Sequence, residues 1–207
     1  MSNYKIILLI SVFCLLFFLP AGTQAMEVEM DELELLADEL ILDDLNQQLI
    51  AIDNVKLIRE DFTLSSDKLI ADDAIEKIEA SGSVTLERGK DILAGEKLEF
   101  DLNDNTARMT GNPSYNSDGL LVKGDEFNFD YQAEVLLVSG EVSITDEQEG
   151  LDASANQLEY KLADEKIILT GNVEIKRERG LMTAERVIID AQSRRITASE
   201  NPRLIIN

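Results

Sequence analysis

A short phrase, a turn residue followed by alternating apolar side chains, recurs six times along this chain. Its first residues are Asp53, Gly82, Gly111, Gly140, Gly171 and Glu200, at steps of 29, 29, 29, 31 and 29 residues. A second series of polar residues precedes it at the same steps: Asp38, Asp67, Glu96, Asp125, Asn156 and Glu185. Because both series share the one irregular step, they indicate an internal repeat, and such a period is typical of stacked architectures.

Within each repeat, apolar residues alternate with polar ones at a spacing of two. The stretch Leu98-Glu-Phe-Asp-Leu102 is typical. This spacing predicts a β-strand with one buried face, whereas a helix would place its apolar residues three and four apart. The apolar columns run through all six repeats, and one of them consists of Leu40, Leu69, Leu98, Phe127, Leu158 and Val187.

Each repeat is expected to supply two or three short strands, joined at turns such as 103–105, 116–119 and 139–140. Pro113 and Pro202 follow two of the turn phrases, where a strand can begin without donating a ladder hydrogen bond. Six stacked repeats of about 29 residues predict an all-β domain with a continuous apolar interior. Two architectures fit this pattern: an antiparallel two-sheet jelly roll, and a parallel β-solenoid with one coil per repeat.

The first residues have the pattern of a secretory signal peptide. An apolar run from Ile6 to Leu19, in which Ser11 is the one polar residue, follows one basic residue, Lys5, and precedes small residues that end at Ala25. The run has 14 residues, whereas a membrane span needs ~20. We therefore expect residues 1–25 to be a signal peptide cleaved after Ala25, which leaves residues 26–207 as a single β domain.

The composition after residue 25 narrows the classes of function. This part has no Cys, His or Trp, and it carries 41 acidic against 18 basic residues, a net charge of −23. So few cations release few counterions from a phosphate backbone, which argues against a nucleic-acid partner. Without His and Cys, the commonest general base and a common nucleophile are missing. The repeated carboxylates have equivalent surroundings, which is typical of a solvated face, so no enzyme, catalytic residue, cofactor or metal site is predicted.

Three phrases of the repeats carry a resemblance to a known family. They are DASANQLEYKLADEKIILTGNVEIKRERGLMTAERVII (152–189), ASGSVTLERG (80–89) and AGEKLEFD (94–101). They resemble the OstA-like, or LptA, family of periplasmic lipopolysaccharide-transport proteins. The family's loose signature opens a unit with Ala-Asp-x-Leu/Val and closes it with Ser/Thr-Gly-Asn-Val. Six copies in register extend the resemblance from about residue 35 to 206.

The resemblance implies a V-shaped antiparallel jelly roll in the periplasm, whose interior shelters the acyl chains of lipopolysaccharide on their way from the inner to the outer membrane. The inward columns that would contact these chains consist of Leu98, Phe100, Phe127, Phe129, Leu136, Val138, Ile144, Leu158, Tyr160, Ile167, Leu169 and Ile175. The same residues would fill an ordinary core without any ligand, because burying a Leu or Phe side chain contributes ~1.5–3 kcal/mol.

The resemblance also implies end-to-end stacking, both between copies and with partners of the same fold, LptC-like at the inner membrane and LptD-like at the outer. The charge is uneven along the repeats: residues 26–75 contain 15 acidic and 3 basic residues, whereas residues 176–207 contain 4 acidic and 7 basic residues. Open edge strands invite pairing, so we expect head-to-tail oligomers that join unlike charges. The end residues are predicted to be Leu40, Leu42, Arg194, Arg195, Leu204 and Ile206.

Three alternatives fit the sequence as well. A retained N-terminal apolar segment would favour a membrane-anchored, LptC-like component of the same pathway. The acidic repeats are also compatible with a structural or adhesive surface protein. A β-solenoid enzyme that acts on polysaccharide would require two carboxylates in unlike surroundings.

Overall fold

The computed structural model describes residues 33–72, 75–190, 192–193 and 195–206, and the predicted signal peptide lies outside these ranges. No helix long and apolar enough to cross a membrane occurs in the described ranges. The strands are β1 (Glu34–Leu36), β2 (Glu39–Asp43), β3 (Gln48–Arg59), β4 (Phe62–Asp72), β5 (Lys77–Arg88), β6 (Asp91–Asp101), β7 (Thr106–Thr110), β8 (Ser114–Ser117), β9 (Leu120–Lys123), β10 (Glu126–Asp130), β11 (Val135–Asp146), β12 (Leu151–Lys161), β13 (Lys166–Arg177), β14 (Gly180–Asp190), β15 (Arg195–Ser199) and β16 (Arg203–Ile206).

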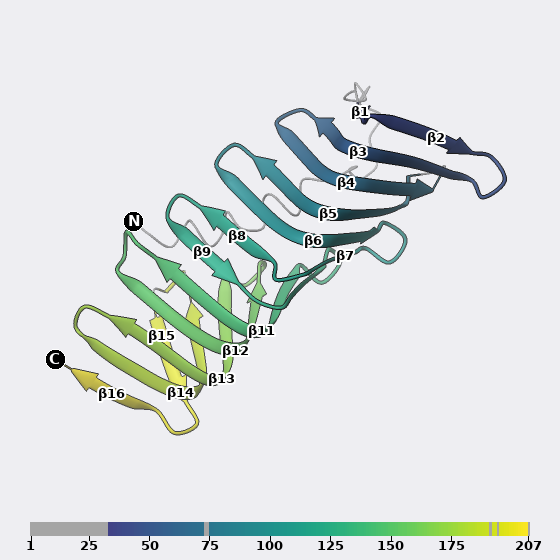
Figure 1. The fold of residues 1–207 in the computed structure, drawn as a ribbon. Helices are drawn as coiled ribbons and strands as arrows, with labels where there is room; N and C mark the ends of the chain where they lie inside the picture. The colour runs from purple at the N-terminus through teal and green to yellow at the C-terminus, as the bar shows by residue number, and fades with distance from the viewer. Residues whose placement is uncertain (1–32, 73–74, 191, 194, 207) are drawn as a thin grey trace.

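The strands form a stack in which sequence neighbours pair in antiparallel fashion (Figure 1). All the pairings of the described strands are antiparallel, which confirms the antiparallel all-β prediction and rules out the parallel solenoid. Most repeats contribute two long strands of 11 or 12 residues, rather than two or three short ones. Pro113 and Pro202 directly precede β8 and β16, as expected of residues that donate no ladder hydrogen bond.

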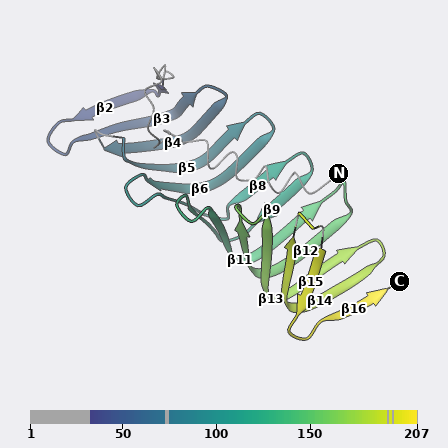
Figure 2. The same cartoon turned by 180° about the vertical axis from the view of Figure 1, so that it is seen from behind.

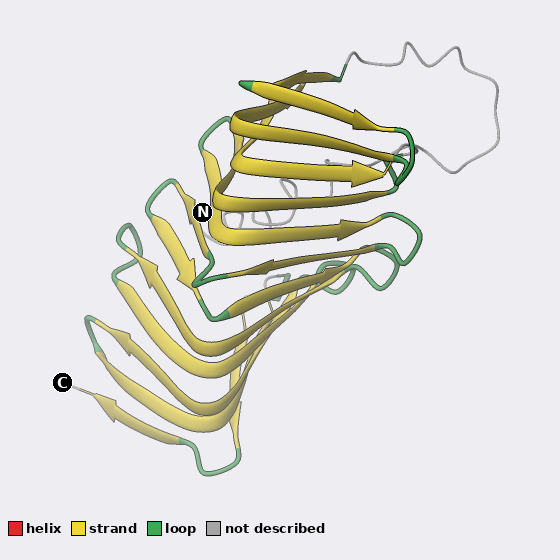
Figure 3. Cartoon of the chain, turned by 45° about the vertical axis from the view of Figure 1, so that its right-hand side comes forward, coloured by secondary structure: helices red, strands yellow, loops and turns green. Residues whose placement is uncertain are grey.

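Each long strand bends at one place, the corner, and so belongs to two walls (Figure 3). The ladders of β3 to β6 and β11 to β14 shift register at this corner. Wall A comprises β2, β7, β10, β15 and the segments 48–52, 68–72, 77–81, 97–101, 135–139, 157–161, 166–170 and 186–190. Wall B comprises β1, β8, β9, β16 and the segments 55–59, 62–66, 84–88, 91–95, 142–146, 151–155, 173–177 and 180–184.

The two polar series of the sequence meet at this corner. Gly140, expected in a turn, instead lies within β11, where its φ of +95° accommodates the bulge that bends the strand. The same arrangement places Asp67 beside Gly82, Glu96 beside Gly111, Asp125 beside Gly140 and Asn156 beside Gly171. In the first and last repeats, the backbone amides of Asp38 and Glu185 donate to the carbonyls of Asp53 and Glu200, at 3.0 and 2.9 Å. The repeat therefore encodes the corner.

Alternating residue sizes let the walls close on each other at the inside of the corner. The paired residues there are Val55 with Ser66, Val84 with Gly95, Val142 with Ala155 and Val173 with Ala184. A large side chain on one strand thus faces a small one on the next. Gly124 has the same role, because a Cβ at this position would lie 2.5 Å from Cγ1 of Val138.

The apolar faces of the two walls pack directly against each other and form one core. A cavity of only about 10 Å³ lies between them, lined by Leu57, Leu64, Ile78, Leu86, Leu98, Phe100 and Ala107. Ala107 is small because it pairs with Phe100 on one side and Phe129 on the other, and these rings fill the space beside it. Each buried Leu or Phe side chain contributes ~1.5–3 kcal/mol, so the interior is the main source of stability.

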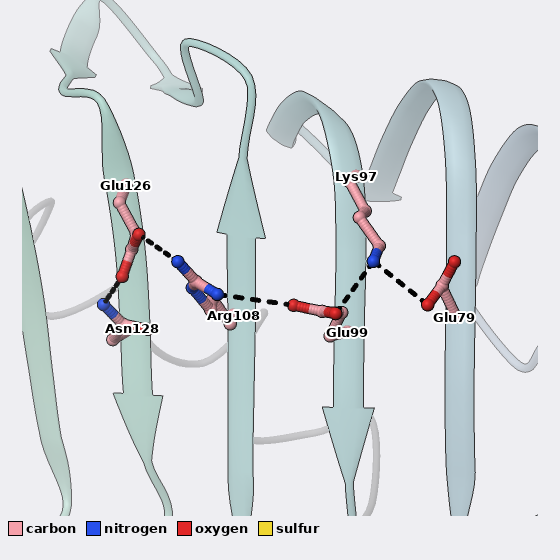
Figure 4. A network of polar contacts seen from close by, with 6 residues as sticks. All are labelled: Glu79, Lys97, Glu99, Arg108, Glu126 and Asn128. Carbon is pink, nitrogen blue, oxygen red and sulfur yellow. Dashed lines mark hydrogen bonds and ion pairs between the residues drawn. The ribbon is translucent and has the colours of Figure 1, made fainter.

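Charged side chains on the outer face of wall A form a chain of contacts across β5, β6, β7 and β10 (Figure 4). Lys97 lies 3.0 Å from Glu79 and 2.8 Å from Glu99, and these carboxylates raise its pKa. Arg108 contacts Glu99 and, at 2.6 Å, Glu126, whose pKa it lowers. The pairs are exposed and screened by salt, so each adds little stability. They instead separate the like charges that this acidic chain would otherwise align across the strands.

Replacement of Gly140 by alanine is expected to destabilise the protein by ~2–5 kcal/mol. An L-residue is strained by ~1–2 kcal/mol in the left-handed region, and overpacking adds ~1–3 kcal/mol. The added Cβ would overlap the side chain of Asp125. Urea denaturation of the variant measures the loss of unfolding free energy.

Gly119→Ala is the matched control for this substitution. Gly119 has a similar φ of +90°, but a Cβ there meets nothing closer than 3.7 Å, so only the backbone strain is introduced. The variant Gly140→Ala should therefore lose more stability than the control. Equal losses of unfolding free energy in the two variants would contradict the close contact between Asp125 and Gly140.

Candidate functional site

The structure brings together all the residues that were predicted to contact acyl chains. They belong to one buried cluster, and their side chains are between 0 and 5% exposed. Ten of them are on wall A, whereas Ile144 and Ile175 are on wall B. The interior is therefore continuous from β6 to β13, and the columns read from the sequence lie inside the V as expected.

Sequence reasoning missed part of the wall B half of this interior. The missed residues include Leu64, Leu93, Tyr115, Leu120 and Val122, all of them buried in the same cluster. The apolar spacing of two that predicts a strand was present here as well, since Leu120 and Val122 stand two apart like the wall A residues. The prediction omitted the wall B segments that precede the corner in β4 and β6, together with the short strands β8 and β9.

Tyrosines contribute polar atoms to the interior, beside a few buried serines and carboxylates. The hydroxyl of Tyr115 donates to the buried carboxylate of Asp91 at 2.8 Å, and burial raises the pKa of this phenol. Burial also raises the pKa of Tyr160 to about 12. Tyr131 stacks edge-on against Phe100 and Phe129, with ring centroids 5.7 and 4.4 Å away. The phenols of Tyr115 and Tyr160 stay neutral at physiological pH, so the interior suits apolar ligands.

The interior is exposed at the two ends of the stack. Leu40 and Leu42 on β2 pair with Ala51 and Leu49, so they continue the inward columns of wall A, yet they are 52% and 77% exposed. Leu204 and Ile206 of β16 likewise extend wall B and are 61% and 74% exposed. Figure 2 shows β2 and β16 at opposite ends of the molecule. Both predicted apolar ends therefore present unburied parts of the interior.

Each end also offers strands with one unpaired side. Among the strands that the structure describes, β1 and β2 pair only with β3, and β15 and β16 pair only with β14. Arg195 is exposed at the start of β15, whereas Arg194, the other predicted basic end residue, lies outside the described ranges. At the opposite end, hydrogen bonds from Asn46 and from the backbone amide of Leu45 hold the pKa of Asp43 below its usual value. The end formed by β1 and β2 is thus acidic at physiological pH, whereas the end formed by β15 and β16 carries exposed cations.

Among the described residues, no three His, Cys, Asp or Glu side chains come together in a way that could hold a metal ion. The carboxylates instead lie on the outer faces, at the turns and along the corner, apart from the buried Asp91 and Asp146. Asp146 accepts the backbone amides of Gln148 and Glu149 at 3.0 and 3.1 Å, so it stabilises a turn.

A bent, two-walled antiparallel stack whose apolar interior is continuous and exposed at both ends defines a class of protein built around one long hydrophobic interior. Comparison with known families places the chain within this class. Residues 34–135 and 152–201 match the family described as "LptA/(LptD N-terminal domain) LPS transport protein". This match covers most of the chain, which belongs to that family.

A solved structure shares the fold. It is the crystal structure of LptH, the LptA-homologous periplasmic component of the lipopolysaccharide transport device from Pseudomonas aeruginosa. The two proteins superpose with a TM-score of 0.50 at 13% sequence identity, over 56% of this chain and 94% of LptH. The likeness to LptH therefore concerns the fold. A comparison with curated proteins finds no match.

Proposed function

We propose that this protein binds lipopolysaccharide by its acyl chains in the periplasm and forms part of a bridge that carries it from the inner to the outer membrane. The observation that supports the proposal most strongly is the interior of the V, which is apolar through the stack and exposed at both ends. A path for acyl chains through water needs this arrangement. Membership of a lipopolysaccharide-transport family agrees with it.

Acyl chains must separate the walls in order to enter. The cavity between the walls holds at most about one water molecule, since its volume is about 10 Å³. Strand ladders run along each wall, and the walls share their backbone at the corner. Rotation about the corner can therefore open the V without breaking a ladder. Each CH₂ group that enters contributes ~0.8 kcal/mol, which offsets the contacts that the walls lose.

Deacylated lipopolysaccharide is expected to bind far more weakly than the intact molecule. A chain of net charge −22 gains little from anionic headgroups, so the buried acyl chains must supply the affinity. Each methylene lost costs ~0.8 kcal/mol, so removal of even two should weaken binding about tenfold. Calorimetric titration of the two ligands into one protein preparation compares the dissociation constants.

The salt dependence of binding provides a control for this comparison. Apolar burial is insensitive to moderate salt, whereas headgroup recognition weakens as salt screens the charges. Intact lipopolysaccharide should therefore keep its affinity across a salt series. Comparable affinities for intact and deacylated ligand would contradict acyl-chain recognition.

The N-terminus and the partners complete the proposal. Cleavage after Ala25 would release a periplasmic protein, whereas a retained segment 6–19 would make it a membrane-anchored, LptC-like component. The mass of the protein isolated from a Gram-negative host distinguishes the two. The exposed ends would then join partners of the same fold, LptC-like at one membrane and LptD-like at the other, by continuing the strand ladders across the junction.

A further inference from the structure

The corner carries a polar groove that the acyl-chain site does not use. The groove has a volume of about 570 Å³ and is lined by Asn112, Lys123, Gly124, Asp125, Glu141, Val142, Ser143, Ser154, Ala155, Asn156 and Asn172. Its polar side chains are exposed, whereas Val142 and Ala155 are buried. The groove therefore lies on the outer surface, across the corner from the core. Its volume is in the range of small-molecule sites.

The same groove continues one repeat further along the stack. A second hollow of about 260 Å³ is lined by Asn172, Val173, Glu174, Thr183, Ala184, Glu185 and Asn201. The pair Val173 and Ala184 occupies the places that Val142 and Ala155 occupy in the first hollow. Asn172 lines both hollows, so they form one periodic groove from β8 to the start of β16. We call it the corner groove.

The corner groove presents unused hydrogen-bonding groups. No described residue hydrogen-bonds to the side-chain amides of Asn112, Asn156 or Asn172. By contrast, Asn54 at the first corner donates its amide to Asp38 at 2.8 Å. Amides that can donate and accept, together with the hydroxyls of the groove, match a ligand rich in hydroxyl or acetamido groups.

The spacing and the charge of the groove further limit the class of ligand that it can bind. Equivalent positions lie two strands apart, or about 9.6 Å along the stack. In an extended peptide, side chains on one face recur every two residues, or about 6.7 Å, so they would not keep step with the groove. A disaccharide of a β-1,4-linked glycan has nearly the length of one step. Lys123 is the one cation among the lining residues, against Asp125, Glu141, Glu174 and Glu185, which disfavours acidic polymers.

We propose that the corner groove binds an extended, non-acidic glycan, whose sugar units follow the repeats along the stack. The asparagine amides and the groove carboxylates bond to the glycan's hydroxyl and acetamido groups. The glycan's source is either a cell-wall strand or an uncharged stretch of the saccharide part of a lipopolysaccharide. The proposal is independent of acyl-chain binding, because the groove and the interior are on opposite faces of the corner.

A nuclear magnetic resonance titration of the isotope-labelled protein tests the proposal. The probes are a tetramer of β-1,4-linked N-acetylglucosamine and the lipid-free saccharide released from lipopolysaccharide. Saturable shifts are expected at the amides of Asn156, Asn172 and Ser143, but not along the outer face of wall A. Response to the tetramer alone assigns a cell-wall glycan, and response to the saccharide alone assigns the lipopolysaccharide. Absence of saturable groove shifts with both probes overturns the proposal.

A pair of matched variants excludes a nonspecific effect. Ser154→Gln places a longer neutral side chain in the groove and should weaken binding of the responding probe about tenfold, the equivalent of one or two lost hydrogen bonds. Ser65 occupies the equivalent place in the second repeat and lines neither hollow, so Ser65→Gln should leave binding unchanged. Unchanged thermal melting confirms that both variants are folded. Equal binding by the two variants contradicts the assignment.

Discussion

Photo-crosslinking residues at Phe127 and Leu169 are expected to capture lipopolysaccharide, whereas those at Asn128 and Thr170 are not. Successive side chains of a strand point to opposite faces, so each pair samples the interior and the outside one residue apart. Phe127 and Leu169 are 1% and 0% exposed, whereas Thr170 is exposed and Asn128 contacts Glu126 on the outer ladder (Figure 4). Mass spectrometry of the cross-linked protein measures the capture.

The same experiment requires a control for the extra volume that a photo-reactive residue adds to the core. A photo-reactive residue at a buried position can loosen the packing, so thermal melting of each variant should accompany the capture. A folded variant that captures lipid only from the inner position supports the inside-outside assignment. Equal capture from folded variants of both kinds would contradict it, because the lipid would then lie on the surface.

Capture of lipid from the inner positions would require the two walls of the V to move apart when lipopolysaccharide binds. The walls pack directly against each other, and the cavity between them at β3 to β7 has a volume of only about 10 Å³. Spin labels at Lys166 on wall A and Lys176 on wall B lie on the outer faces, away from the corner, and leave the core intact. Their separation should lengthen when lipopolysaccharide binds, as distance measurements by electron paramagnetic resonance can show.

The sequence predicted the repeat and the inward columns because both depend on local spacing. Leu158 and Tyr160 stand two apart in a strand, and no tertiary information is needed to place them on one face. The two polar series were also visible in the sequence. Their contact was not, because Asp125 reaches Gly140 only through the register of two neighbouring strands.

Strand length and interior volume could not be predicted from the sequence. A glycine inside an alternating pattern was interpreted as a turn, yet a β-bulge keeps β11 paired on both sides of Gly140 and merely bends it. The sequence also does not reveal whether an apolar column lines a channel or a core. That depends on how closely the walls approach, which small residues such as Gly124 allow at the corner.

Head-to-tail oligomers are expected at low salt and high protein concentration. Residues 26–75 carry a net charge of −12, whereas residues 176–207 carry +3, so unlike ends attract and two acidic ends repel. The half-exposed Leu40 and Leu204 would be buried at the junction, and the unpaired sides of β2 and β15 would extend one ladder across it. Salt should weaken the assembly, because complementary charge mainly sets encounter rate and register.

Charge reversal at the last strands should abolish this assembly. Arg195→Glu with Arg203→Glu makes the basic end acidic, so sedimentation velocity should detect monomers where the parent protein forms oligomers. Lys90→Glu with Lys161→Glu changes the net charge equally but lies between the two charged end segments, so it should leave assembly intact. Glu34→Lys with Glu39→Lys at the first end should restore pairing with the reversed protein. A parent protein that stays monomeric at low salt, or a reversal that the complementary change fails to rescue, would contradict charge-guided head-to-tail assembly.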